Sequence, residues 1–222
     1  MEPIAYIHTP FAQKFGVPRQ SGLVDTAADI VFEPAYRNAD AVRGLEGFSH
    51  LWLLWQFHQM ADKAWSPTVR PPRLGGNVRM GVFATRSPHR PNPIGLSCVK
   101  LTGIDLTAQG PVLHVSGADL MDGTPIYDIT PYLPYCDAHP EATGGWTDDV
   151  ESRELTVNFP PELLAQIPES DREGLIGVLA QDPRPRYQSD PERIYGLTYG
   201  SANIKFLVVE NTLTVNEVKN EK

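Results

Sequence analysis

Short runs in which apolar and polar residues alternate fill much of the chain up to residue 130, and Gly or Pro residues separate them. Alternation with a period of two is typical of strands that bury one face. The run at 50–58 is rich in aromatic residues and predicts a buried strand. We expect strands at 3–8, 29–33, 50–58, 78–84, 95–106, 112–118 and 126–129. This pattern predicts a mainly β fold, either a barrel or a sandwich.

The pattern changes after residues 137–150, which are polar, contain Gly and are the best candidate for a linker. Beyond them, the apolar positions predict helices at 161–166 and 170–180 and strands at 155–159, 194–198, 204–209 and 213–218. We therefore expect a second, small α+β unit. The 21 Pro and 18 Gly residues among 222 agree with a protein of strands and loops rather than a helical bundle.

The distribution of charged residues along the chain leads to a different expectation from the net charge. A net charge of −8 argues against a nucleic-acid-binding protein. However, no Asp or Glu occurs between Lys63 and Ile104, and this stretch carries a charge of +7 against −15 for the rest of the chain. We therefore expect a positively charged face on an acidic body, although a solvated basic surface would give the same run.

The run Gly81–Ser97 is the most informative part of this basic stretch. Three prolines within six residues exclude a helix and stiffen the loop between two predicted strands. The loop presents two guanidiniums, an imidazole and an amide, which suit an anionic or nucleotide-like ligand. The residues concerned are Arg86, Pro88, His89, Arg90, Pro91, Asn92 and Pro93.

Cysteine usage and hydropathy predict a cytoplasmic protein without a metal. Cys98 lies in an apolar, strand-like run, and neither it nor Cys136 has the spacing of a metal ligand. The N-terminus has no basic segment followed by an apolar one, and no apolar run is long enough to span a bilayer. We therefore expect no membrane association.

Two further pairs of polar residues have both a structural and a functional interpretation. His58 and Gln59 follow the apolar run at 50–57, where a satisfied strand-end histidine and a ligand contact are both reasonable. Asp119 and Asp122 are either turn formers or a general acid–base pair. The sequence alone does not decide between these interpretations.

Two loops complete the set of candidates. Pro18, Arg19 and Gln20 form either an ordinary loop or part of a ligand site. The run 182–187 combines a carboxylate, two guanidiniums and a phenol on a chain stiffened by Pro, and is either a linker or a second ligand loop. Taken one by one, these residues do not name a reaction.

Six motifs, however, follow one another in the order of a known family. They are Lys14–Gln20, Ala39–Trp52, Arg70–Gly76, Gly81–Ser97, Asp119–Tyr132 and Ala180–Pro185. Together they resemble the tRNA-methyltransferase O (TrmO) family, strongly over about residues 1–135 and in the loop at 180–187, and weakly over the rest of the tail.

The resemblance implies an enzyme that transfers a methyl group from S-adenosylmethionine to N6 of N6-threonylcarbamoyladenosine at position 37 of tRNA, with threonine tRNA as the expected substrate. It also implies a homodimer. The implied domains are an N-terminal cofactor-binding β-barrel at 1–138 and a small α+β domain at 150–222. The cofactor contacts implied by the resemblance are Pro18, Arg19, Gln20, His58, Gln59, Arg86, Leu96, Asp119, Leu120, Met121 and Asp122.

The residue types fit such a reaction. Arg86 or Arg19 can bind the methionine carboxylate of the cofactor, and Asp119 or Asp122 can bind its ammonium or ribose hydroxyls. The resemblance gives catalytic roles to Asp182, Arg184 and Tyr187, with Asp182 or Tyr187 as the base and Arg184 placing it.

The acid-free stretch is expected to bind the tRNA backbone through Arg70, Arg73, Arg79 and Arg90. Arg90 or Arg184 could also bind the threonyl carboxylate. Two alternatives remain at this stage: a non-catalytic RNA- or nucleotide-binding barrel, and a phosphoester hydrolase that uses the Arg, His and Asp loops.

Overall fold

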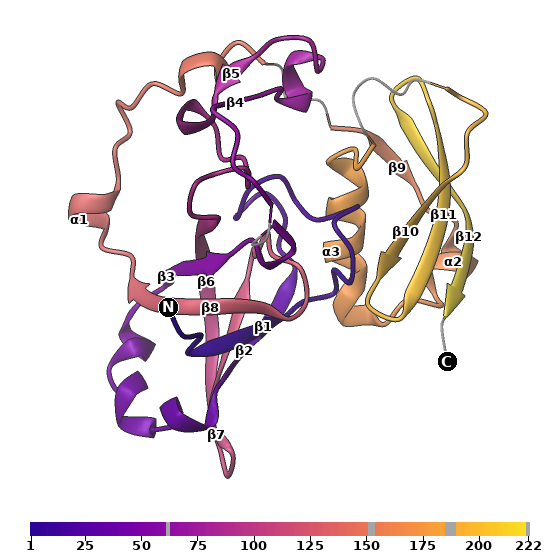
Figure 1. Ribbon diagram of the computed structural model, residues 1–222. Helices are drawn as coiled ribbons and strands as arrows, with labels where there is room; N and C mark the ends of the chain where they lie inside the picture. The colour runs from indigo at the N-terminus through magenta and orange to yellow at the C-terminus, as the bar shows by residue number, and fades with distance from the viewer. Residues whose placement is uncertain (61–62, 151–153, 185–189, 221–222) are drawn as a thin grey trace.

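The first half of the chain forms a closed, six-stranded antiparallel barrel. The structure, a computed structural model, describes residues 1–60, 63–150, 154–184 and 190–220. The strand order around the barrel is β1-β2-β7-β6-β3-β8 (Figure 1). The bounds are β1 (Ala5–His8), β2 (Ala27–Phe32), β3 (His50–Gln56), β6 (Ile94–Thr107), β7 (Gly110–Ser116) and β8 (Thr124–Pro131). The prediction of a mainly β fold is confirmed, with a barrel rather than a sandwich.

Along the barrel strands, side chains point alternately into the core and outward. In β3, Leu51, Leu53 and Trp55 are buried while the residues between them are partly exposed. Gly95, opposite Trp55 in β6, has no side chain, and an added Cβ would overlap the indole ring. β8 closes the barrel because it pairs with β1 on one side and β3 on the other. Three 3-10 helices connect β2 to β3: η1 (Pro34–Tyr36), η2 (Ala39–Val42) and η3 (Leu45–Gly47).

A small lobe is inserted between β3 and β6. It contains a two-stranded sheet of β4 (Thr68–Val69) and β5 (Met80–Gly81) and the 3-10 helices η4 (His58–Met60), η5 (Pro72–Leu74) and η6 (Val82–Ala84). The prediction of a strand over 78–84 is therefore wrong for most of its length. The chain turns at η6 instead, and the Thr85 hydroxyl donates to the Val82 carbonyl over 2.8 Å.

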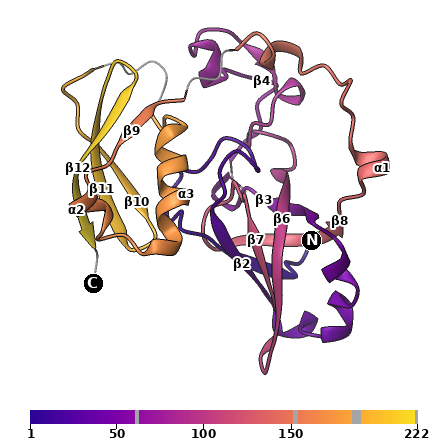
Figure 2. The ribbon, with the colours of Figure 1, turned by 180° about the vertical axis from the view of Figure 1, so that it is seen from behind.

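The second half of the chain is a four-stranded sheet with helices, as the α+β prediction states. The strand order is β10-β11-β12-β9, with β12 and β9 parallel. Helix α3 lies between this sheet and the barrel in both views (Figures 1 and 2). The bounds are α1 (Pro134–Asp137) and η7 (Gly145–Thr147) in the connection, then β9 (Thr156–Asn158), α2 (Pro161–Leu164), α3 (Glu169–Ala180), β10 (Tyr195–Tyr199), β11 (Ala202–Val209) and β12 (Thr212–Asn220).

The segment 9–26 between β1 and β2 joins the core of this C-terminal unit rather than that of the barrel. Phe11 is fully buried there, and its ring meets that of Tyr199 edge-on at 5.8 Å between centroids. Val24 packs against Gly177 of α3 so closely that a Cβ on the glycine would lie 2.7 Å from a Val24 methyl. The loop that carries Pro18–Gln20 is thus held between two parts of the protein.

None of the helices in the described ranges is long and apolar enough to cross a membrane.

Candidate functional site

A broad cleft of about 1830 Å³ opens where the barrel, the lobe and the C-terminal unit meet. Over the described residues, seven cationic side chains line it against three acidic ones. The cations are Lys14, Arg19, Arg70, Arg73, Arg79, Arg86 and Arg184, and the acids are Asp149, Asp182 and Glu210. The cleft exceeds the 300–1,000 Å³ that is typical for one small ligand. It therefore has room for a nucleotide-sized cofactor together with part of a nucleic acid.

Three segments that are far apart in the sequence come together in this cleft. Arg86, from the loop at 81–97, donates a hydrogen bond to the side-chain oxygen of Gln20. Arg19 donates to the side-chain oxygen of Gln181, at the end of α3, over 2.9 Å. Pro18 lines the same wall. The structure thus brings the predicted residues Pro18, Arg19, Gln20 and Arg86 into one site.

Asp119 is tied to the barrel wall and is not among the cleft-lining residues, but it is close enough to Arg86 for that charge to act on its carboxyl. The Ser97 hydroxyl donates to Asp119 Oδ1 over 2.5 Å and accepts a hydrogen bond from Trp55 Nε1 over 2.9 Å. Burial raises the pKa of the Asp119 carboxyl, and this effect outweighs the opposing hydrogen bond from Ser97 and the charge of Arg86. A partly buried carboxylate beside a guanidinium is suited to bind a cationic or hydroxyl-bearing group of a ligand.

The other residues of the predicted 119–122 turn have structural partners. The Leu120 side chain is buried in the barrel core. The Met121 carbonyl accepts hydrogen bonds from the amide and hydroxyl of Thr124. Asp122 accepts the Thr9 amide over 3.1 Å and lies 3.3 Å from His8 Nδ1. This geometry favours the turn-forming interpretation for Asp122 over an acid–base pair with Asp119.

His58, Gln59 and Leu96 are not among the cleft-lining residues. His58 and Gln59 form η4, which is held near the start of β6 because the Phe57 amide donates to the Pro93 carbonyl over 2.8 Å. Leu96 points out of the barrel wall and is 53% exposed. All three lie at the barrel end that carries the loop at 81–97, next to the cleft rather than in its wall.

The predicted catalytic loop forms part of the opposite wall of the cleft. Arg184 donates from Nε to Asp182 Oδ1 over 2.8 Å and from Nη2 to Oδ2 over 2.9 Å. Asp182 has a left-handed backbone, with φ of 50°. Because both carboxylate oxygens accept from the guanidinium, Asp182 is better suited to orient groups than to take a proton. Tyr187 lies outside the described residues.

The four arginines predicted to bind tRNA separate into two groups. Arg70, Arg73 and Arg79 line the lobe side of the cleft, and Arg73 Nη2 also donates to the Val150 carbonyl over 3.1 Å. Arg90 instead folds back on its own loop and donates to the Thr85 carbonyl over 2.8 Å and to the Val82 carbonyl over 3.3 Å. Its Nη1 group is therefore engaged within the lobe.

The sequence interpretation missed several residues of the site. Ser97 and Gln181 belong to motifs that were singled out, but their partners come from other segments. Trp146 also lines the cleft, and its indole nitrogen donates to the Ala84 carbonyl over 2.9 Å. It lies in the stretch predicted as a linker, where no local signal points to a site. Among the residues that the structure describes, no group of three or more His, Cys, Asp and Glu side chains is arranged to hold a metal ion.

Comparison with known proteins identifies the family to which this architecture belongs. Residues 6–138 match the model of the tRNA-methyltransferase O N-terminal domain, and residues 152–221 match that of the TrmO C-terminal domain. The tRNA (adenine(37)-N6)-methyltransferase of Escherichia coli K12 is 44% identical over 218 residues, which cover 94% of this chain and 93% of the relative.

A second relative and a solved structure agree with this match. A Pseudomonas aeruginosa protein is 43% identical over 205 residues, covering 89% of this chain and 87% of its own, and its name includes the words S-adenosylmethionine-dependent methyltransferase. The crystal structure of TrmO from P. aeruginosa superposes with a TM-score of 0.78 at 35% identity, covering 99% of this chain and 95% of that one. The chain, in both its barrel and its C-terminal unit, therefore belongs to the tRNA-methyltransferase O family of S-adenosylmethionine-dependent enzymes.

Proposed function

We propose that this protein, as a tRNA (adenine 37-N6)-methyltransferase, acts on adenosine 37 of threonine tRNA after N6 has received a threonylcarbamoyl group. The observation that carries the proposal is the cationic cleft between the barrel, the lobe and the C-terminal unit. A threonylcarbamoyl group adds a carboxylate to the base, and guanidiniums bind carboxylates through charge-assisted hydrogen bonds. The E. coli relative is named for methylation at N6 of adenine 37. Family membership favours an enzyme over a non-catalytic barrel.

The residues at the barrel side of the cleft fit S-adenosylmethionine. The cofactor supplies a methyl group on a positively charged sulfur. Arg86 and Gln20, already in contact, offer a guanidinium and an amide for the cofactor carboxylate. Asp119, held by Ser97, offers a carboxylate for the ammonium or the ribose hydroxyls. Pro18, Arg19, His58, Gln59, Leu96 and the backbone of 120–122 complete the proposed cofactor site.

The opposite wall is proposed to place the substrate. The bound cofactor would supply the methyl group and keep the sulfur as the leaving group, and a base on this wall would take the proton from N6. Because the carbamoyl group makes N6 a poor nucleophile, alignment and removal of water are the main tasks of the protein. Asp182, locked by Arg184, orients the groups around N6, and Tyr187 remains the proposed base.

Arg70 is the proposed contact for the threonyl carboxylate. Arg184 is paired with Asp182 and Arg90 is hydrogen-bonded to its own loop, so both guanidiniums already have protein partners. Arg70 lines the cleft and, among the described residues, has no hydrogen-bond or ion-pair partner.

The proposed function also includes assembly of the protein as a homodimer. Sedimentation equilibrium of the purified protein tests this assembly.

The direct test is methylation of defined RNA. Purified protein is incubated with S-adenosylmethionine and with threonine tRNA transcripts that either carry or lack the threonylcarbamoyl group, and nucleosides are analysed by mass spectrometry. We expect N6-methyl-N6-threonylcarbamoyladenosine from the first transcript and little methylated adenosine from the second. Equal methylation of the two transcripts would refute the threonylcarbamoyl requirement, and no product from either would refute the activity.

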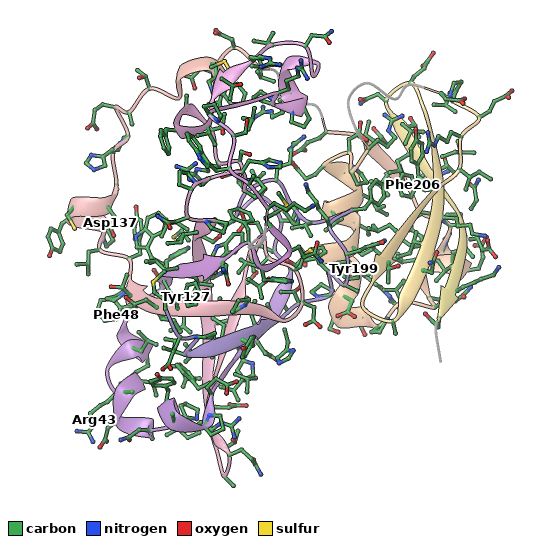
Figure 3. The ribbon with its side chains drawn as sticks, viewed as in Figure 1. Arg43, Phe48, Tyr127, Asp137, Tyr199 and Phe206 are labelled. Atoms are coloured by element: carbon green, nitrogen blue, oxygen red, sulfur yellow. The ribbon has the colours of Figure 1, made fainter. Side chains whose placement is uncertain are left out.

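The role of Arg70 is tested by its effect on this preference. Arg70→Ala should lower kcat/KM for the threonylcarbamoyl transcript by about 10-fold or more, the scale of one lost charged hydrogen bond. Arg43, an exposed arginine at the far end of the barrel (Figure 3), is paired with Asp40 and provides the matched control variant, Arg43→Ala. If both variants behave alike, Arg70 does not contact the substrate carboxylate.

A further inference from the structure

Phe83 is an exposed aromatic side chain at the rim of the cationic cleft. It is 72% exposed, which is unusual for a phenylalanine in a folded protein. Its neighbours along the chain and across the lobe, among them Arg79, Thr85 and Trp146, line the cleft. The ring therefore lies close to residues that line the cleft, although it is not itself part of the lining.

The lobe holds this ring in place instead of burying it. The guanidinium of Arg90 lies over the Phe83 ring, 5.6 Å from its centroid. Arg90 is itself fixed by two hydrogen bonds to the carbonyls of Val82 and Thr85, on either side of Phe83. The Val82 amide donates to Pro67 over 3.0 Å, so the turn is attached to the neighbouring strand. Because Arg90 covers one face of the Phe83 ring and the side chain is largely exposed, the other face is open to a planar group of a ligand.

The charge around Phe83 indicates what that partner is. No Asp or Glu occurs between Lys63 and Ile104, and Arg70, Arg73 and Arg79 lie in the same lobe. A surface that combines an open aromatic face with an excess of cations over acids is complementary to unpaired nucleotides, because bases stack on aromatic rings while phosphates meet the cations. Another protein surface would gain from the ring but not from the uncompensated charge.

We propose that Phe83, supported by Arg90, is a stacking platform for an unpaired nucleobase next to the adenosine that is methylated. The proposal rests on the proposed function, because it assumes that an RNA loop enters the cleft. It adds a base contact to the backbone contacts expected of the lobe arginines. Arg90 thereby acts as a positioning residue rather than as a phosphate ligand.

Binding of an anticodon stem-loop RNA at several salt concentrations tests the platform. Phe83→Ala should raise the dissociation constant by roughly 5-fold to 100-fold, the effect of removing one stacked base. The slope of the logarithm of the RNA association constant against the logarithm of the salt concentration should stay unchanged, because the substitution removes no charge. Arg79→Ala should reduce that slope by about 0.7–0.9, as expected for one lost phosphate contact. Phe83→Trp should retain tight binding.

Controls separate this inference from a folding effect and from the proposed function. Tyr36→Ala removes an exposed aromatic beside β2, away from the lobe, and should leave RNA affinity unchanged. Calorimetry with S-adenosylmethionine should give the same affinity for Phe83→Ala as for the unmodified protein. RNA affinity of Phe83→Ala within twofold of the original would overturn the platform, even if methylation proceeds. So would a change in subunit assembly at unchanged RNA affinity, which would indicate that a second copy of the chain covers the ring.

Discussion

Replacement of Phe11 by Ala is expected to weaken both the stability of the protein and its affinity for the cofactor. Phe11 belongs to the chain segment between two barrel strands, yet it is fully buried in the core of the C-terminal unit against Tyr199. Phe-to-Ala changes at buried sites cost about 3–5 kcal/mol, because apolar contacts are lost and a cavity remains. For a protein of this length, such a loss lowers Tm by roughly 6–20 °C.

The cofactor effect follows from the position of Phe11 in the chain. Its segment continues directly into Pro18–Gln20, and its carbonyl accepts the amide of Asp122 over 2.9 Å. Without the ring, the segment loses its anchor in the C-terminal core, so Arg19 and Gln20 are less well ordered before the cofactor binds. Titration calorimetry with S-adenosylmethionine at a temperature where the variant is fully folded should therefore give a higher dissociation constant.

Phe206→Ala is the matched control. Phe206 is equally buried in the same core and stacks on Tyr195 at 5.7 Å, but it comes from β11 of the sheet (Figure 3). It should show a similar loss of stability with cofactor affinity unchanged. If the two variants lose stability alike and both bind the cofactor like the original protein, the reasoning that links the shared core to the cofactor loop is wrong.

Three further predictions concern the same region. Burial raises the pKa of the Asp119 carboxyl, so its neutral form, which lacks the charge that attracts an ammonium, persists to higher pH than in an exposed carboxyl. Cofactor affinity should therefore still be rising with pH above the usual Asp pKa of about 4, and calorimetry should show that Asp119→Asn abolishes this rise. Gln181→Ala removes one hydrogen-bond acceptor of Arg19 and should weaken cofactor binding by about 2- to 10-fold with little change in urea-induced unfolding; unaltered affinity would exclude a positioning role for Gln181. Gly177→Ala should destabilise the fold by about 1–3 kcal/mol despite the better helix propensity of Ala, because the new Cβ meets Val24. Urea denaturation should show that Gly177→Ala costs less stability in a Val24→Ala background than in the original protein. An equal cost in both backgrounds would contradict the assigned clash.

The sequence predicted those features that depend on local pattern. The aromatic-rich composition of residues 50–58 predicted the buried strand β3, and the second unit was recognisable from the change of pattern after the polar stretch 137–150. The motifs also identified loops that the structure brings together, such as those of Gln20 and Arg86. In each case, the signal lies within a few consecutive residues.

Features that depend on contacts between distant segments were not predictable in this way. Nothing in the residues around Phe11 indicates that it completes a core whose other buried members, apart from Val24, follow more than 140 residues later. Arg90 was expected to face RNA because of its charge. It turns inward because η6, where a strand was expected, and the residue after it present the carbonyls of Val82 and Thr85. That Arg90 binds these backbone carbonyls depends on the local backbone geometry rather than on the residue type.

The core shared between the segment 9–26 and the C-terminal unit has a consequence for the order of events during synthesis. All six barrel strands have been synthesised once Pro131 is added, before any part of β9–β12 has been made. Until α3 and the final sheet are complete, Phe11 and Val24 have no core to enter, and the loop at 18–20 has no Gln181 to hold it. A nascent chain can therefore close its barrel early, while ordering of the proposed cofactor loop has to await synthesis of the C-terminal unit.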